Sequence, residues 1–144
     1  MAYIPKDVEW FLAQLVEEFR VQGSKRNIVH INYVLIRART PEEAYRESMK
    51  LGKQSNQTYK NPHGKVVTHR FLGLRNLDAI FDPLEHGSEI MFVERLGMSA
   101  AGTRKLVRSK RELEAFLPVR GRKGRPDYSS KEIMEMVEER LRRH

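Results

Sequence analysis

The chain has 144 residues, a net charge of +8 and 40% hydrophobic residues, which is enough for one domain with an appendage. It contains no cysteine, which excludes disulfides, thiolate metal sites and thiol catalysis. No apolar run approaches the roughly 20 residues of a membrane span, and the first residues lack the pattern of a signal peptide. We therefore expect a cytoplasmic protein without membrane contact.

Two strands are predicted first, over residues 9–22 and 28–38. Apolar side chains occupy both parities of the first strand, which indicates cover on both faces, and Glu17 interrupts the more apolar parity. His30 and Asn32 begin one face of the second strand. Its other face is apolar and consists of Val29, Ile31, Tyr33 and Leu35. The segment between the strands has turn composition, so we expect an antiparallel hairpin.

A helix is predicted over residues 40–51. Thr40 can cap it, Pro41 suits the first helical position and Glu43 can close a capping box. Gly52 is well placed to end the helix in the left-handed conformation.

Two further strands are predicted at residues 65–74 and 89–96, with loops over residues 54–61 and 78–88. Gly73 is expected to mark a bulge. The predicted fold class is therefore α+β, with a four-stranded, mainly antiparallel sheet in the order β-β-α-β-β and one helix packed on a face.

The last third of the chain is predicted to hold two more helices. A short helix opens at Ser109 with a capping box closed by Glu112, and it stops before Pro118. A C-terminal amphipathic helix is capped by Ser129 and Ser130. It is too short to be stable alone, so we expect it to dock on the body, pair with a copy of itself or fold on a partner. The predicted parts are a domain at 1–117, a basic linker at 118–128 and a helix at 129–144.

Four stretches of the sequence carry a family resemblance. They read "WFLAQLV", "YVLIRARTPEEAYRESMKLGK", "HRFLGLRNLDAI" and "HGSEIMFVERL". Over roughly residues 9–97 the chain resembles the bacterial family named domain of unknown function 4288. The resemblance implies a small β-β-α-β-β unit, and it implies no activity and no catalytic residue.

Positive charge is concentrated late in the chain. Residues 104–125 contain nine basic and two acidic residues, a net charge of +7 out of the chain's +8. A near-neutral body joined to such a segment favours a polyanionic partner, so we expect DNA or RNA to bind here. The predicted nucleic-acid-binding residues are Arg104, Lys105, Arg108, Lys110, Arg111, Arg120, Arg122, Lys123 and Arg125.

Part of this basic segment, residues 120–126, resembles an AT-hook, a peptide that lies in the minor groove of A·T-rich DNA. The resemblance implies arginines in a narrow, negative groove and glycines that allow close approach. The core reads Lys-Gly-Arg-Pro instead of Arg-Gly-Arg-Pro, and Asp127 follows where a basic residue is expected. Non-specific phosphate contact and a solvated linker are the other interpretations.

Two other functions fit the sequence. One is a protein-interaction module, an inhibitor or immunity-type partner, using the sheet face or the acidic loop 78–89. The other is a small hydrolase or nuclease using His30, His69 and nearby acids. The loop acids do not have calcium-loop spacing and no phosphate-binding motif is present, so we expect no metal, no cofactor and no enzymatic activity. Because the edges of a small sheet need protection, we also expect a homodimer.

Overall fold

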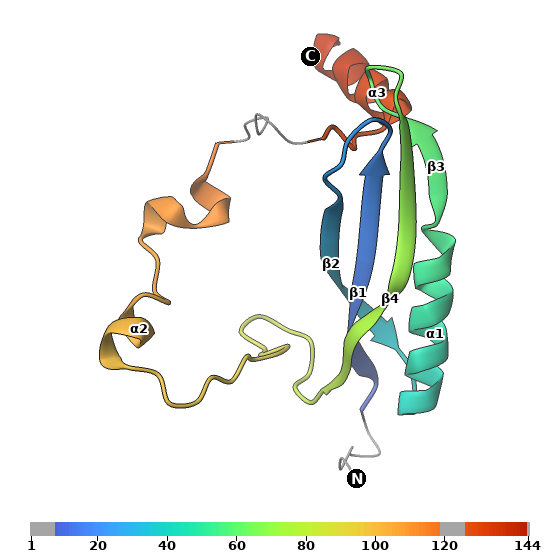
Figure 1. The fold of residues 1–144 in the computed structure, drawn as a ribbon. Coiled ribbons are helices and arrows are strands. Elements are labelled where there is room, and N and C mark those ends of the chain that lie inside the picture. Colours follow the sequence, from blue (N-terminus) through green and yellow to red (C-terminus); the bar gives the residue numbers. More distant parts are fainter. Residues whose placement is uncertain (1–7, 119–125, 144) are drawn as a thin grey trace. The chain divides into compact units, whose positions relative to one another are not determined.

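Four antiparallel strands form one sheet in the order β2-β1-β4-β3 (Figure 1). The computed structural model describes residues 8–118 and 126–143. The elements of the sheet and its helix are β1 (Trp10–Val21), β2 (Ile28–Arg37), α1 (Pro41–Gln54), β3 (Gln57–Lys60) and β4 (Val66–Ile80). Helix α1 packs on one face, which confirms the predicted α+β fold class.

The predicted hairpin of the first two strands is confirmed, since β1 and β2 pair without any register shift. At the turn end, the side chain of Asn27 donates a hydrogen bond of 2.7 Å to Glu18 Oε2. This bond, helped by nearby Arg20, lowers the pKa of the Glu18 carboxyl below its ordinary value. The Glu18 carboxylate on β1 therefore fixes the β1–β2 turn through Asn27.

The fourth strand of the sheet is not the one that the sequence predicted. Residues 57–60, expected as part of a loop, form β3 and pair with the start of β4. Residues 89–96, expected as a strand, have no strand structure. Polar residues suit β3 because it lies at the edge of the sheet with its side chains largely exposed. The apolar alternation at 89–96 has no neighbouring strand in the described chain to pair with.

Strand β4 is longer than predicted and reaches Ile80, which takes Asp78 out of the predicted loop and into the sheet. The added length allows β4 to pair along all of β1. The predicted bulge is confirmed, because register shifts flank the consecutive residues Leu15 and Val16, and Val16 pairs with Gly73. Gly73 has a φ of +147°, which residues with a side chain rarely adopt.

Helix α1 begins as predicted but ends later. Thr40 Oγ1 accepts a hydrogen bond of 3.1 Å from the Glu43 amide, and Pro41 opens the helix. The predicted left-handed stop at Gly52 is wrong, since the helix continues to Gln54. The glycine serves packing instead. A Cβ at Gly52 would lie 2.5 Å from the Phe71 ring, so only glycine lets the helix approach the sheet this closely.

Two hydrophobic clusters lie on the face that α1 covers. The larger lies under the helix, and its buried residues include Phe11, Ala13, Leu15, Ile36, Ala44 and Phe71. The smaller lies past the C-terminal end of α1 and consists of Phe19, Val21 and Val67, with Ile28 and Tyr59 packed against it. Glu17 falls between the two clusters on β1, because it has the same parity as Leu15 and Phe19.

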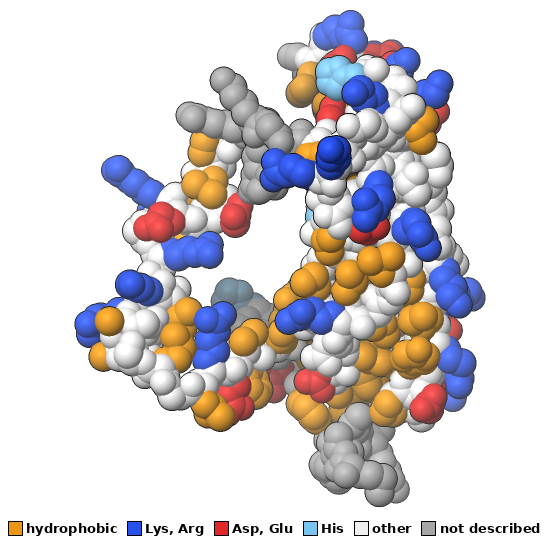
Figure 2. All heavy atoms as spheres, viewed as in Figure 1, with side chains coloured by type: hydrophobic (Ala, Val, Ile, Leu, Met, Phe, Trp, Pro, Cys, Tyr) orange, Lys and Arg blue, Asp and Glu red, His pale blue; other side chains and the backbone are white. Residues whose placement is uncertain are grey.

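The opposite face of the sheet is open along β2. Its exposed apolar stripe consists of Val29, Ile31, Tyr33 and Leu35, which are between 41% and 55% exposed. Hydrophobic side chains gather over the strands in the surface view (Figure 2). On the neighbouring β1, Leu12 and Gln14 are buried, and Gln14 Nε2 donates to Met91 Sδ at 3.4 Å. This part of β1 is covered on both faces, as predicted.

Residues 92–118, called the arm below, belong to a compact unit separate from the sheet. The arm contains α2 (Ala100–Arg104) and two 3-10 turns, η1 (Lys110–Glu112) and η2 (Glu114–Phe116). The capping box predicted at Ser109 is present, but it opens these two turns instead of a regular helix. Every arm residue except Gly102 is exposed, so the described arm has no core of its own.

The C-terminal helix α3 (Lys131–Arg142) belongs to the same compact unit as the sheet. Ser130 caps it as predicted, accepting from the Ile133 amide at 3.5 Å. The helix carries an apolar stripe of five exposed residues, Ile133, Met134, Met136, Val137 and Leu141. None of the helices in residues 8–118 and 126–143 has the length and apolarity to cross a membrane.

Candidate functional site

Five of the nine predicted nucleic-acid-binding residues lie in the described arm. They are Arg104 at the end of α2, Lys105 next to it, Arg108, and Lys110 and Arg111 in η1. All five are exposed, and none pairs with a carboxylate in the described part of the chain. The other four, Arg120, Arg122, Lys123 and Arg125, lie outside the described residues, as does the AT-hook-like sequence apart from Pro126.

Two capped turns position the arm cations. Ser99 Oγ accepts a hydrogen bond of 3.0 Å from the Gly102 amide at the start of α2. In η1, Ser109 Oγ donates to Glu112 Oε1 at 2.7 Å. The hydrogen bonds from Ser109, with the nearby charge of Arg108, lower the pKa of the Glu112 carboxyl. Glu112 is thus engaged within its own turn, while the basic side chains around it face solvent.

A buried polar cluster lies between the two hydrophobic clusters of the sheet. Its centre is Glu17, which is only 4% exposed. Glu17 Oε2 accepts from Asn32 Nδ2 on β2, and Oε1 accepts at 2.5 Å from Ser55 Oγ at the end of α1. His69 Nε2 on β4 lies 3.3 Å from the same Oε1. Three elements of the fold therefore converge on one carboxylate, which meets the requirement that a buried charge has partners.

His69 is enclosed on every side by protein groups. Its ring stacks on Phe19 with 4.1 Å between centroids, and its Nδ1 lies 3.4 Å from Gln57 Nε2. Its Nε2 is near Glu17 but not aligned for a hydrogen bond, and it has no other partner among the described residues. The two side chains are therefore in close contact in a poorly solvated site but are not joined by a directed hydrogen bond.

The expectation that His30 and His69 face each other across the sheet is met only in part. Both lie on the helix-covered face, but β1 separates them and the Phe19 ring lies between, 4.9 Å from His30. No group of three or more His, Asp or Glu in the described ranges could hold a metal ion. Both ring nitrogens of His69 face protein side chains, which favours a structural role for the pair.

Residues 126–130, called the strap below, cover the smaller hydrophobic cluster. The Tyr128 ring lies 4.8 Å from the Phe19 ring and stands edge-on to His30 at 5.2 Å. The strap therefore closes the part of this face that α1 leaves uncovered, and it joins α3 to the sheet.

The strap backbone is held by two side chains from β3 and the turn that follows it. Asn61, only 2% exposed, accepts two backbone N–H groups of that turn through Oδ1 and donates through Nδ2 to the Asp127 carbonyl at 3.0 Å. The Tyr59 hydroxyl donates to the Tyr128 carbonyl. Burial, together with the nearby Tyr128 and Asp127, raises the pKa of Tyr59.

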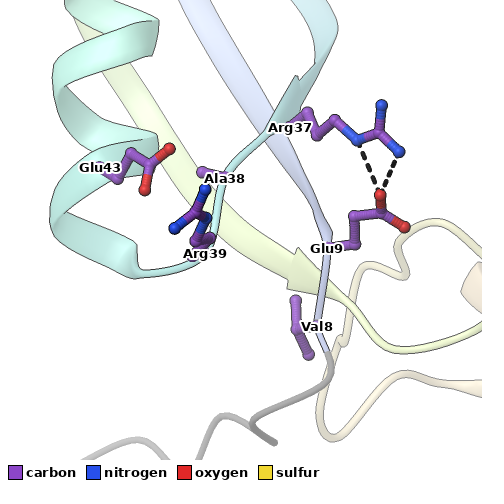
Figure 3. Close-up of a pocket in the computed structure, with 6 residues that line it drawn as sticks. All are labelled: Val8, Glu9, Arg37, Ala38, Arg39 and Glu43. Carbon is purple, nitrogen blue, oxygen red and sulfur yellow. Dashed lines mark hydrogen bonds and ion pairs between the residues drawn. The ribbon is translucent and has the colours of Figure 1, made fainter.

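A surface pocket of about 510 Å³ lies at the other end of the sheet, where β1 starts, β2 ends and α1 begins (Figure 3). It is lined by Val8, Glu9, Arg37, Ala38, Arg39 and Glu43. Arg37 Nε donates to Glu9 Oε1 at 2.7 Å, and the guanidinium lies 5.3 Å from the Trp10 ring centroid. Its two arginines balance its two glutamates, and the lining offers no nucleophile, so the pocket indicates no particular chemistry.

The acidic loop 78–89 forms hydrogen bonds between its own residues. Asp82 Oδ2 accepts from the Glu89 amide at 3.3 Å, and Ser88 Oγ accepts from the Glu85 amide at 3.0 Å. Asp78 lies in β4 and bonds the next amide in the strand. The four acids therefore do not gather around one point, which agrees with the absence of calcium-loop spacing.

The polar cluster and the strap were not predicted from the sequence. A signal for the cluster was present, because Glu17 interrupts the apolar parity of a strand, and an inward-facing carboxylate requires buried partners. His69 likewise has the parity of the buried Val67. The sequence holds no comparable signal for Tyr128, because its contact with Phe19 joins opposite ends of the chain.

These features define a small α+β domain with a helix-backed antiparallel sheet, a sealed polar cluster and a basic arm. The chain belongs to the family described as domain of unknown function (DUF4288), whose match covers residues 10–92, more than half of its length. This confirms the expected resemblance. The arm, apart from its first residue, and the strap and α3 lie outside the match. Comparisons with curated proteins and with solved structures gave no match.

Proposed function

We propose that the protein binds DNA or RNA through residues 104–125 and does not act on it as an enzyme. The supporting observation is that the five described cations of this segment are exposed and have no carboxylate within ion-pair distance in the described chain. Exposed cations without internal partners can replace the counterions of a phosphate backbone, and the release of those counterions drives binding.

The arm geometry favours contact with phosphates over the reading of bases. Helix α2 has only five residues, too few to lie along a major groove as a recognition helix does. The cations instead project from two separate capped turns and from Arg108 between them, an arrangement that suits a flexible polyanion. We therefore propose binding with little sequence preference.

The test is a salt titration with labelled duplex DNA and single-stranded RNA. If about six cations contact phosphates, log K should fall against log salt with a slope of about −5 for the duplex. Changing Arg104, Lys105 and Arg108 to Gln should reduce the magnitude of that slope by about 2.7, since each lost contact removes about 0.9. The matched control changes Lys50 and Lys53 of α1 to Gln and should leave the slope unchanged. A slope near zero for the unaltered chain would contradict the proposal.

A second candidate function is protein interaction through the open sheet face. The observation that favours it is the exposed apolar stripe of Val29, Ile31, Tyr33 and Leu35. The same strand β2 is an edge of the sheet, with ten residues, no proline, no lysine and no register shift. Such an edge is suited to strand pairing, and pairing with a second copy would give the homodimer that we expect.

Sedimentation at increasing protein concentration tests this candidate. A homodimer built on β2 should become monomeric when Ile31 and Tyr33 are both changed to Lys, because two charges would enter the paired face. Changing Tyr45 and Leu51, exposed apolar residues of α1, to Lys is the control and should leave association unchanged. A chain that stays monomeric at all concentrations would reject the dimer.

A further inference from the structure

The strap is held by contacts of the kind that recognise a peptide ligand. Two consecutive backbone carbonyls of the strap accept hydrogen bonds from side chains of the sheet. The Asp127 carbonyl accepts from Asn61 Nδ2, and the Tyr128 carbonyl accepts from the Tyr59 hydroxyl. One aromatic side chain, Tyr128, packs against the rings of Phe19 and His30 and stays 38% exposed. Backbone hydrogen bonds that supply affinity and a side-chain pocket that supplies specificity are the usual elements of such recognition.

The receiving side is organised by the sheet itself. Asn61 is fixed because its Oδ1 accepts the amides of His63 and Lys65 in the β3–β4 turn, which aims its amide group at the strap. The Phe19 ring is fixed by stacking on buried His69. A site whose side chains are already positioned loses little entropy on binding.

The strap also contacts the site through a carboxylate. Asp127 Oδ2 lies 3.6 Å from His63 Nε2. Asp127 Oδ1 accepts from the Ser129 amide at 3.0 Å and from Ser129 Oγ at 2.5 Å. Asp127 therefore stabilises the conformation of the strap and contacts the site, while the Tyr128 ring makes the aromatic contact with the sheet.

We propose that Phe19, His30, Tyr59, Asn61 and His63 form a recognition site for an Asp-Tyr-Ser peptide, and that the chain's own residues 127–129 are its resident occupant. This site is separate from the basic arm, and the inference does not depend on nucleic-acid binding. Its consequence is that the segment leading into α3, a helix without buried residues, is attached to the sheet by an exchangeable contact centred on one tyrosine.

The experiment adds a fluorescent peptide copying residues 126–132 to two full-length chains. In the Tyr128→Ala chain the strap has lost its anchor, so the peptide should bind saturably, as measured by fluorescence anisotropy. The unaltered chain should bind it at least roughly tenfold more weakly, because its own strap competes at a high effective concentration. A peptide with Ala in place of Tyr should bind neither chain. Equal binding to both chains, or no binding to a folded Tyr128→Ala chain, would overturn the proposal.

A second variant tests the site without removing the tyrosine. Asn61→Asp keeps the Oδ1 acceptor for the turn amides. It removes the Nδ2 donor to the Asp127 carbonyl and places a carboxylate oxygen next to that carbonyl. Hydrogen exchange across the strap should then be at least roughly tenfold faster. The control is Asn56→Asp, since Asn56 Oδ1 accepts from the Phe71 amide at 2.7 Å, away from the strap. The same exchange rates in both variants would show that Asn61 does not hold the strap and would count against the site.

Discussion

Glu17 Oε1 and His69 Nε2 lie 3.3 Å apart on adjacent strands, and both side chains are almost fully enclosed. The carboxylate also accepts hydrogen bonds from Asn32 and Ser55. The cluster therefore joins β1, β2, β4 and the end of α1 around a single charge. A charge of this kind stabilises the native arrangement only while all of its partners remain.

Changing Glu17 to Ala should lower the free energy of unfolding by about 3 kcal/mol, because buried His69 and the part-buried Asn32 and Ser55 lose their common partner. Urea denaturation followed by circular dichroism measures the effect. The control is Glu9→Ala, which breaks the exposed pair with Arg37 and should cost less than about 1 kcal/mol. Similar losses in the two variants would show that the buried cluster contributes no more than a surface ion pair.

Changing Gly52 to Ala should destabilise the fold, although alanine is the better helix former. The new Cβ would lie 2.5 Å from the Phe71 ring, so α1 or the ring must move, at a cost of about 1–3 kcal/mol. Over most of this range the cost exceeds the gain in helix propensity of about 1 kcal/mol. Thermal unfolding of this variant and of Lys50→Ala, an exposed position on the same helix, makes the comparison. A raised melting temperature for Gly52→Ala would contradict the close packing.

Strap docking should weaken at high pH. The pKa of Tyr59 is raised by burial, which means that the folded chain favours the neutral phenol that donates to the Tyr128 carbonyl. The stabilisation is complete below the ordinary tyrosine pKa of about 10 and is lost as the pH rises through the higher folded value. Subtracting the tyrosinate absorbance titration of Tyr59→Phe from that of the unaltered chain isolates this group. A difference titration centred at or below the ordinary value would be evidence against burial of this hydroxyl.

The η1 turn should respond to the loss of its cap. Ser109 lowers the pKa of Glu112, so the carboxylate stabilises the turn above its ordinary pKa and stops doing so as the pH falls through the lowered value. Ser109→Ala should move the pKa of Glu112 up towards its ordinary value, as measured by NMR titration of the carboxyl carbon. Glu114, in the neighbouring turn, serves as the internal reference. No change at Glu112 would mean that the capping box is not formed in solution.

The sequence was sufficient for the elements whose signals are local. Thr40, Pro41 and Glu43 define the start of α1, and parity alone predicts which side chains of β1 face the helix. Two features escaped because they depend on pairing between distant segments. Residues 57–60 become a strand only because β4 passes beside them, and residues 89–96 do not become one although their alternation is stronger.

The site residues divide in the same way. The basic residues of the arm were found from composition, because charge is visible without a fold. The polar cluster required knowledge that Asn32, Ser55 and His69 would meet at Glu17, which only the register of three strands and the packing of the end of α1 provide. Gly52 shows the same limit, since a local rule predicted a helix stop where the sheet required a close approach.

The two edge strands of the sheet differ in length and polarity, and this difference limits the size of an assembly formed by edge pairing. β3 offers four mainly polar residues, whereas β2 offers ten with an apolar face. Two molecules joined through β2 about a two-fold axis would leave only their β3 borders outward, and these are poor templates for another strand. Growth would stop at a pair, so the proposed association is self-limiting and does not lead to a fibre.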